Sequence, residues 1–144
     1  MSAAVVDASV AAKWLLPRAG ETLVEEAARV LARHSSGEDR LVVPDLFWAE
    51  IGNILWKAVR RNRCSKRAAQ ASLQLLQEYG LRTFAAGDDL LALAFEVATE
   101  FDRTFYDSLY VALAIHVKVE LITADERLAN ALAARLPVKW LGAL

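Results

Sequence analysis

Three acidic residues stand at points of the chain where strands are expected to end or helices to begin, and a fourth lies one turn into a helix that enters from the same edge. They are Asp7, Glu50, Asp107 and Asp125. Carboxylates brought to one place repel each other and raise each other's pKa, and a divalent cation removes that repulsion. Oxygen ligands without a histidine or thiolate partner favour Mg²⁺ or Mn²⁺ over zinc. The four residues are therefore candidate metal ligands.

A cation held in this way can bind a phosphate oxygen, activate water and orient an in-line displacement. The acids thus predict a metal-assisted displacement at a phosphate group. Four carboxylates could hold one ion or two, and the residues alone leave that number open. Ser9 and Thr123 accompany Asp7 and Asp125, and their hydroxyls could hydrogen-bond the ligating carboxylates or cap helices.

Each acid also has a purely structural interpretation. Thr104 and Asp107 match a capping box, and the turn around Asp125 offers the same explanation. Acids near helix N-termini suit the helix dipole, and Glu50 could be an ordinary solvated residue. The functional interpretation rests on all four acids standing at one expected edge.

Short apolar runs alternate with helical patterns along the chain. Strands are expected over residues 3–7, 41–43, 81–85, 121–123 and 138–141, and helices over about 9–16, 22–34, 45–58, 65–78, 88–100, 105–117 and 125–134. Ser65 and Asp88 are expected to cap the helices that start there. Strands this short and apolar, separated by helices, indicate a parallel sheet covered on both faces. The prediction is a three-layer α/β/α fold with a four- or five-stranded parallel sheet, formed as one domain over residues 1–144. Ligands of such sheets bind beyond the carboxyl ends of the strands, at the switch point.

Composition narrows the class of protein. The chain has 144 residues, a formal net charge of -1 and a hydrophobic fraction of 56%. Its apolar runs fall short of the roughly 20 residues of a membrane span, and its first residues do not resemble a signal peptide. The single cysteine, Cys64, fits a reducing compartment, so we expect a cytoplasmic protein without a membrane association.

Four segments of the chain together resemble one known family. They read VVDAS at residues 5–9, PDLFWAEIGN at 44–53, YDSLYVALA at 106–114 and LITAD at 121–125. In order and spacing they are similar to the PIN-domain family, and most of all to the VapC toxins of toxin–antitoxin pairs. The resemblance covers nearly the whole chain.

The resemblance implies a Mg²⁺- or Mn²⁺-dependent endoribonuclease with a PIN-like parallel sheet. It implies that Asp7, Glu50, Asp107 and Asp125 are the catalytic, metal-binding acids and that Thr123 is the polar residue of the last motif. Members of the family are commonly homodimers, neutralised by a cognate antitoxin that covers the site. RNA and an antitoxin protein are therefore the expected partners.

A basic segment follows the second motif on the same expected helix. Asn53, Lys57 and Arg60 or Arg61 lie at helical spacing from Glu50, so they share one face. We predict that this stripe guides the RNA backbone toward the acids. The same residues could instead contact an antitoxin or a second subunit, or form a solvated connection.

Three other functions stay open. One is a PIN nuclease that processes RNA outside a toxin–antitoxin system. Another is an inactive module that binds RNA or protein. The third is a phosphatase with Asp7 as nucleophile, which would want a second aspartate where Ser9 stands.

Overall fold

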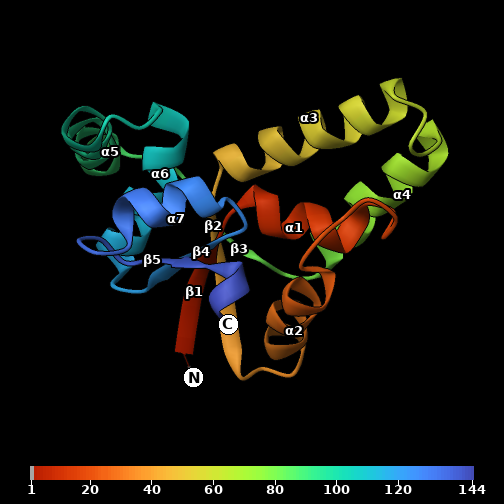
Figure 1. Cartoon of the computed structure of the whole chain (residues 1–144), viewed down its shortest axis with the longest axis horizontal. Coiled ribbons are helices and arrows are strands. Elements are labelled where there is room, and N and C mark those ends of the chain that lie inside the picture. The colour runs from red at the N-terminus through yellow and green to blue at the C-terminus, as the bar shows by residue number, and fades with distance from the viewer. Residues whose placement is uncertain (1) are drawn as a thin grey trace.

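A computed structural model describes residues 2–144 of the chain and centres on one sheet (Figure 1). All neighbouring strands pair in parallel, in the order β3-β2-β1-β4-β5. The strands are β1 (Ser2–Val6), β2 (Asp39–Pro44), β3 (Arg82–Phe84), β4 (Glu120–Thr123) and β5 (Val138–Trp140). The predicted parallel sheet is confirmed, with five strands.

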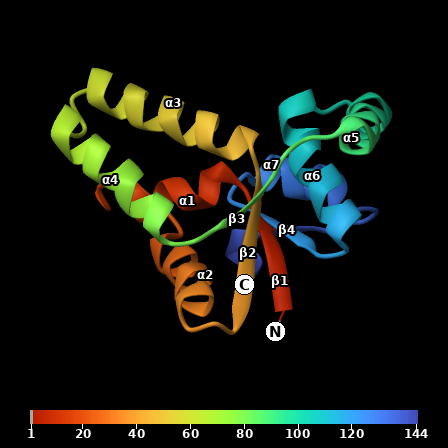
Figure 2. The ribbon, with the colours of Figure 1, turned by 180° about the vertical axis from the view of Figure 1, so that it is seen from behind.

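Helices cover both faces of this sheet. Figures 1 and 2 show α1 to α4 on one side and α5, α6 and α7 on the other. The helices are α1 (Ala8–Leu15), α2 (Val24–Ser35), α3 (Leu46–Arg60), α4 (Lys66–Glu78), α5 (Asp88–Phe101), α6 (Phe105–Val117) and α7 (Glu126–Leu132), and a short 3-10 turn, η1 (Leu141–Ala143), follows β5. The three-layer α/β/α fold predicted from the sequence is confirmed.

Helix α6 is the centre of the core. Its residues from Ser108 to Ala114 are all buried, because the helix packs on β1, β2 and β4 and is covered by α5. A helix enclosed in this way is apolar on every side, which accounts for part of the high hydrophobic content. Within residues 2–144, no helix combines the length and apolar character that crossing a membrane requires.

Several helix starts agree with the sequence and two differ from it. Ser65 caps α4 through a hydrogen bond from the Ala68 backbone N–H, as predicted. Helix α1 begins at Ala8 instead of Ser9, because the Ser9 hydroxyl bonds a neighbouring carboxylate and does not cap the helix. The predicted cap at Asp88 is also wrong: Asp88 lies inside α5, after Gly87.

The order of the strands creates a switch point beside β1. The chain first adds β2 and β3 on one side of β1, then returns to add β4 and β5 on the other. The Asp7 backbone N–H still donates to the Ile122 carbonyl at 3.0 Å, which holds the carboxyl ends of β1 and β4 together. A crevice beyond these ends is the expected ligand site of an open parallel sheet.

Candidate active site

Asp7 follows the last residue of β1 and is held by two hydroxyls. Its side chain is buried, with 8% of the residue exposed. The Ser9 hydroxyl donates to Asp7 Oδ2 at 2.7 Å and the Thr123 hydroxyl donates to the same oxygen at 2.8 Å. Within residues 2–144, no side chain donates a hydrogen bond to the other oxygen, Oδ1. Asp7 therefore has one oxygen anchored by two hydroxyls and one that accepts from no side chain of the described residues.

The same two hydroxyls organise the turn that follows β4. Ser9 Oγ accepts from the Ala124 backbone N–H at 3.0 Å, and Thr123 Oγ1 accepts from the Asp125 N–H at 3.0 Å. Each hydroxyl thus accepts from this turn and donates to Asp7. The structure places Ser9 and Thr123 where the sequence suggested, as partners of a carboxylate, and Thr123 also supports the turn.

Glu50 lies one turn into α3 and is half-buried, so it is not an ordinary solvated residue. The Tyr110 hydroxyl, which comes from α6, donates to Glu50 Oε1 at 2.5 Å. No other side-chain donor to this carboxylate occurs within the described chain. One oxygen of Glu50 is therefore fixed by the core helix, as one oxygen of Asp7 is fixed by hydroxyls.

Asp107 and Asp125 each take part in a helix start. Thr104 Oγ1 accepts from the Asp107 backbone N–H at 3.1 Å, which is one half of the predicted capping box. Asp125 Oδ1 accepts from the backbone N–H groups of Arg127 and Leu128, at 3.0 and 3.2 Å. Asp125 therefore does cap α7, as its structural interpretation predicted, and this cap uses one oxygen of the carboxylate.

Electrostatics show that the four acids are neighbours. Burial is the main cause that raises the pKa of Asp7, and the charge of Asp107 raises it further against the opposing hydroxyl bonds. Burial likewise raises the pKa of Glu50, with smaller contributions from Asp7 and Asp107, while the Tyr110 bond lowers it. The pKa of Asp107 is raised by burial and then by the charge of Asp125. The fold thus brings the four carboxylates close enough that each one repels at least one of the others.

The chemistry of this group fits a hard divalent cation. All four donors are carboxylate oxygens, three have raised pKa values, and Asp7 and Glu50 each keep an oxygen free of side-chain donors. Across residues 2–144, no three such side chains already stand as a compact ligand cage. Like charges favour this separation, so binding an ion requires the side chains to move toward it.

Two residues near the acids were missed in the sequence. Tyr110 contacts Glu50, and the positive charge of Arg103 lowers the pKa of Asp107. Tyr110 could have been identified from the sequence, because it lies three residues after Asp107 on one helix face. It also carries a hydroxyl within an otherwise apolar run, residues 109–115. Arg103 lies in the turn before α6, where spacing predicts no contact.

The residues of the predicted basic stripe are exposed. Helix α3, along which most of them lie, extends away from the sheet (Figure 1). Asn53, Lys57 and Arg60 lie on α3, and Arg61 is the residue that ends it. The Arg60 guanidinium lies 5.0 Å from the ring centre of Trp56, whose exposed fraction is 52%. None of these cations forms a salt bridge with a residue in the described range.

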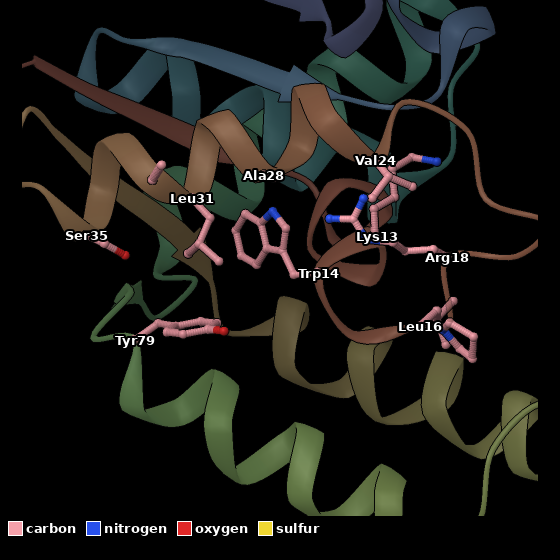
Figure 3. Close-up of a pocket in the computed structure, with 11 residues that line it drawn as sticks. Lys13, Trp14, Leu16, Arg18, Val24, Ala28, Leu31, Ser35 and Tyr79 are labelled. Carbon is pink, nitrogen blue, oxygen red and sulfur yellow. The ribbon is translucent and has the colours of Figure 1, made fainter.

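A separate hollow of about 620 Å³ lies between α1, α2 and the end of α4 (Figure 3). Trp14 stands at its centre, donates its indole N–H to the Ala27 carbonyl at 2.7 Å, and meets Tyr79 edge to face. None of the four acids lines this hollow. The acid cluster and the hollow are therefore distinct features.

Comparison with known proteins identifies the family of this chain. The model of the PIN domain family matches residues 4–132. The chain is 33% identical over 122 residues to Ribonuclease VapC1 of Mycobacterium tuberculosis, which covers 77% of this chain and 90% of that protein. It is 34% identical over 128 residues to Ribonuclease VapC3 of Pyrobaculum aerophilum, which covers 88% and 92%.

Solved structures share the fold. The crystal structure of PAE2754 from Pyrobaculum aerophilum superposes with a TM-score of 0.71 at 25% identity, over 99% of this chain and 85% of that one. A toxin–antitoxin complex from Klebsiella pneumoniae matches with a TM-score of 0.65 at 15% identity, over 94% and 95% of the two chains. With its parallel sheet, its acids at the switch point and its matched length, this chain belongs to the PIN-domain family.

Proposed function

We propose that this protein is a divalent-metal-dependent endoribonuclease that hydrolyses RNA phosphodiester bonds and acts as the toxin of a VapBC-type pair. The observation that carries the proposal is the cluster of four mutually repelling carboxylates at the switch point of a PIN-domain sheet. Its support from related proteins is that two relatives, each about one third identical, are named ribonucleases.

Asp7, Glu50, Asp107 and Asp125 would hold Mg²⁺ or Mn²⁺. A divalent cation supplies a Lewis acid for a phosphate oxygen and lowers the pKa of a bound water. The protein contributes orientation: the hydroxyls of Ser9 and Thr123 hold Asp7, and the first turn of α7 holds Asp125. Carboxylates held by such bonds lose little freedom when they engage a ligand, so the site is partly organised in advance.

The exposed face of α3 would carry the RNA backbone toward these acids. Lys57 and Arg61 are exposed and free of salt bridges in the described chain, so they can meet phosphates without breaking an ion pair. Trp56, already stacked with Arg60, offers an exposed aromatic surface for a base. This arrangement suits single-stranded RNA, whose bases are free to stack.

A cognate antitoxin is the protein partner that we propose. One structural neighbour is a toxin–antitoxin complex, and its toxin-like fold matches this chain over nearly its whole length. An antitoxin that covers the acids would block RNA from the same crevice. Copurification of the chain with the product of an adjacent gene, and loss of RNA cleavage in that complex, would support this part of the proposal.

The decisive experiment is an RNA cleavage assay with the purified, partner-free chain. A mixed single-stranded RNA pool is incubated with Mg²⁺, with Mn²⁺ or with EDTA. We expect cleavage that requires the cation and is lost in Asp7→Asn and Asp107→Asn. Glu96→Gln is the matched control, because it neutralises an exposed acid on α5 away from the site. Cleavage that persists in EDTA or in both site variants would contradict the proposal.

A further inference from the structure

Tyr110 is a polar side chain at the centre of the core. It lies in the middle of α6, and only 1% of the residue is exposed. A buried phenol needs a hydrogen-bond acceptor, since an unpaired hydroxyl in an apolar environment is costly. Its immediate neighbours Leu109 and Val111 are buried and apolar, and the partner of its hydroxyl comes from another element.

That partner is the carboxylate of Glu50, sixty positions earlier in the chain. The distance between Tyr110 Oη and Glu50 Oε1 is 2.5 Å, which is typical of a hydroxyl that donates to an ionised oxygen. The bond joins α6, which packs on one face of the sheet, to α3, which belongs to the opposite helical layer (Figures 1 and 2). It ties one acid of the cluster to the most buried helix of the protein.

The bond also completes a pattern shared by three of the acids. Asp7 has one oxygen held by hydroxyls, and Asp125 has one held by backbone N–H groups. Glu50 has the longest of these side chains and therefore the most rotamers to restrict. Tyr110 is the one side-chain donor that restricts it within residues 2–144, and Oε2 stays free of such donors.

Asp107 lies on the same face of α6, three residues before Tyr110. One rigid helix therefore presents one acid of the cluster directly and orients a second through a hydroxyl.

We propose that Tyr110 is a positioning residue that holds Glu50 through Oε1, so that its second oxygen is presented to a divalent cation, and that it thereby sets the metal affinity of the site. This inference rests on the proposed metal-dependent function. It goes beyond the four acids and the hydroxyls of Ser9 and Thr123, because the role assigned to Tyr110 acts through its bond to Glu50.

The test is Tyr110→Phe, which removes the hydroxyl and leaves the ring. Binding of Mn²⁺ is measured by calorimetry and by the electron paramagnetic resonance signal of free Mn²⁺, without RNA. We expect Mn²⁺ affinity to fall by about 10- to 100-fold, the usual effect of removing a partner of a metal ligand. Ser108→Ala is the matched control, because it deletes a neighbouring buried hydroxyl whose 2.7 Å bond goes to the Thr104 carbonyl.

A double-mutant cycle separates positioning from general loosening of the core. If Tyr110 acts through Glu50, Tyr110→Phe should change Mn²⁺ affinity far less in a Glu50→Gln background than in the wild type. In cleavage assays the rate of Tyr110→Phe should recover at high Mn²⁺, while the KM for RNA stays unchanged. An equal loss in both backgrounds would overturn the role.

A second readout needs no change at Tyr110. In wild-type protein with ¹³C at the tyrosine Cζ atoms, Mg²⁺ should shift the Tyr110 signal, while Tyr79, remote from the acids, stays constant. Unaltered Mn²⁺ affinity in Tyr110→Phe, or a Tyr110 signal that ignores Mg²⁺ bound by the wild type, would overturn the inference alone. A wild type that binds Mn²⁺ but cleaves no RNA would instead contradict the proposed nuclease and leave the metal readout to judge Tyr110.

Discussion

The carboxylates of the site differ in what holds each of them. Asp7 accepts from two hydroxyls, Glu50 from a phenol and Asp125 from backbone N–H groups. In each case the bonds engage one oxygen, and for Asp7 and Glu50 they offset the effect of burial on the pKa only in part. The free energy that is still needed to keep these carboxylates ionised is what a bound cation would offset.

Asp7 should destabilise the protein when no divalent cation is present. Because burial raises the pKa of this carboxyl, the folded state loses stability as pH rises above the value of the unfolded chain. Asp7→Asn cannot ionise, so in EDTA at neutral pH it should be more stable by about 1 kcal/mol. Urea unfolding measures this, and the difference should shrink toward pH 4. Glu96→Gln should show no gain, and a less stable Asp7→Asn would contradict the argument.

Asp125 allows its structural and functional roles to be separated. Asparagine can still cap α7, whereas alanine cannot, and loss of a cap costs about 1 kcal/mol. Asp125→Asn should therefore keep the free energy of unfolding of the wild type and lose RNA cleavage. Asp125→Ala should lose RNA cleavage and also have a lower free energy of unfolding. Chemical denaturation and the cleavage assay, run on both variants, make the comparison. Normal cleavage by Asp125→Asn would remove this residue from the catalytic set.

Among the elements, α3 connects the site to the rest of the surface. It carries Glu50 near its start and exposed cations near its end, and it runs away from the sheet beside α4 (Figure 2). The Arg60 guanidinium already interacts with the Trp56 ring. Lys57 and Arg61 are therefore the better candidates for contacts with phosphates.

Reversal of these two charges tests the stripe. Lys57→Glu with Arg61→Glu should weaken binding of single-stranded RNA and flatten the slope of log affinity against log salt by about 1.4, for two lost phosphate contacts. Fluorescence anisotropy at several salt concentrations, on an Asp7→Asn background that does not cleave, gives the slope. The pair Arg18→Glu and Arg29→Glu makes the same charge change at other exposed positions. Equal slopes for the two pairs would remove the stripe from RNA binding.

At the scale of the whole molecule, the site exists because the strand order reverses beside β1. The four acids come from the end of β1, from α3, from α6 and from the turn before α7, and these elements belong to both helical layers. A ligand that engages all four would therefore join the two layers across the sheet edge.

Divalent cations should stabilise the folded protein as a whole. A ligand that binds only the folded state at 100 times its Kd adds about 2.7 kcal/mol, which for a domain of this size raises Tm by roughly 8 °C. Scanning calorimetry with Mg²⁺ or Mn²⁺ against EDTA should show this rise in the wild type. It should be absent in Asp7→Asn. A wild-type Tm that ignores both cations would count against a metal site.

Much of the architecture followed from local patterns. Apolar runs separated by helical periodicity predicted the parallel three-layer fold, and side-chain types predicted the caps at Ser65 and Thr104. These features depend on neighbours within a turn or two, where spacing alone fixes which groups can meet. The acids were recognisable for the same reason, because three of them stand at a strand or helix boundary and Glu50 lies one turn into a helix.

What only the tertiary structure decided are contacts between residues far apart in the chain. The start of α1 moved because the Ser9 hydroxyl bonds Asp7 and the turn after β4, and the orientation of Glu50 depends on Tyr110 from the opposite helical layer. The pairing of Arg60 with Trp56 also depends on the rotamers of two long side chains. Periodicity shows which face a residue occupies, but packing between elements determines the partner that it meets there, and the chemistry of this site lies in those partners.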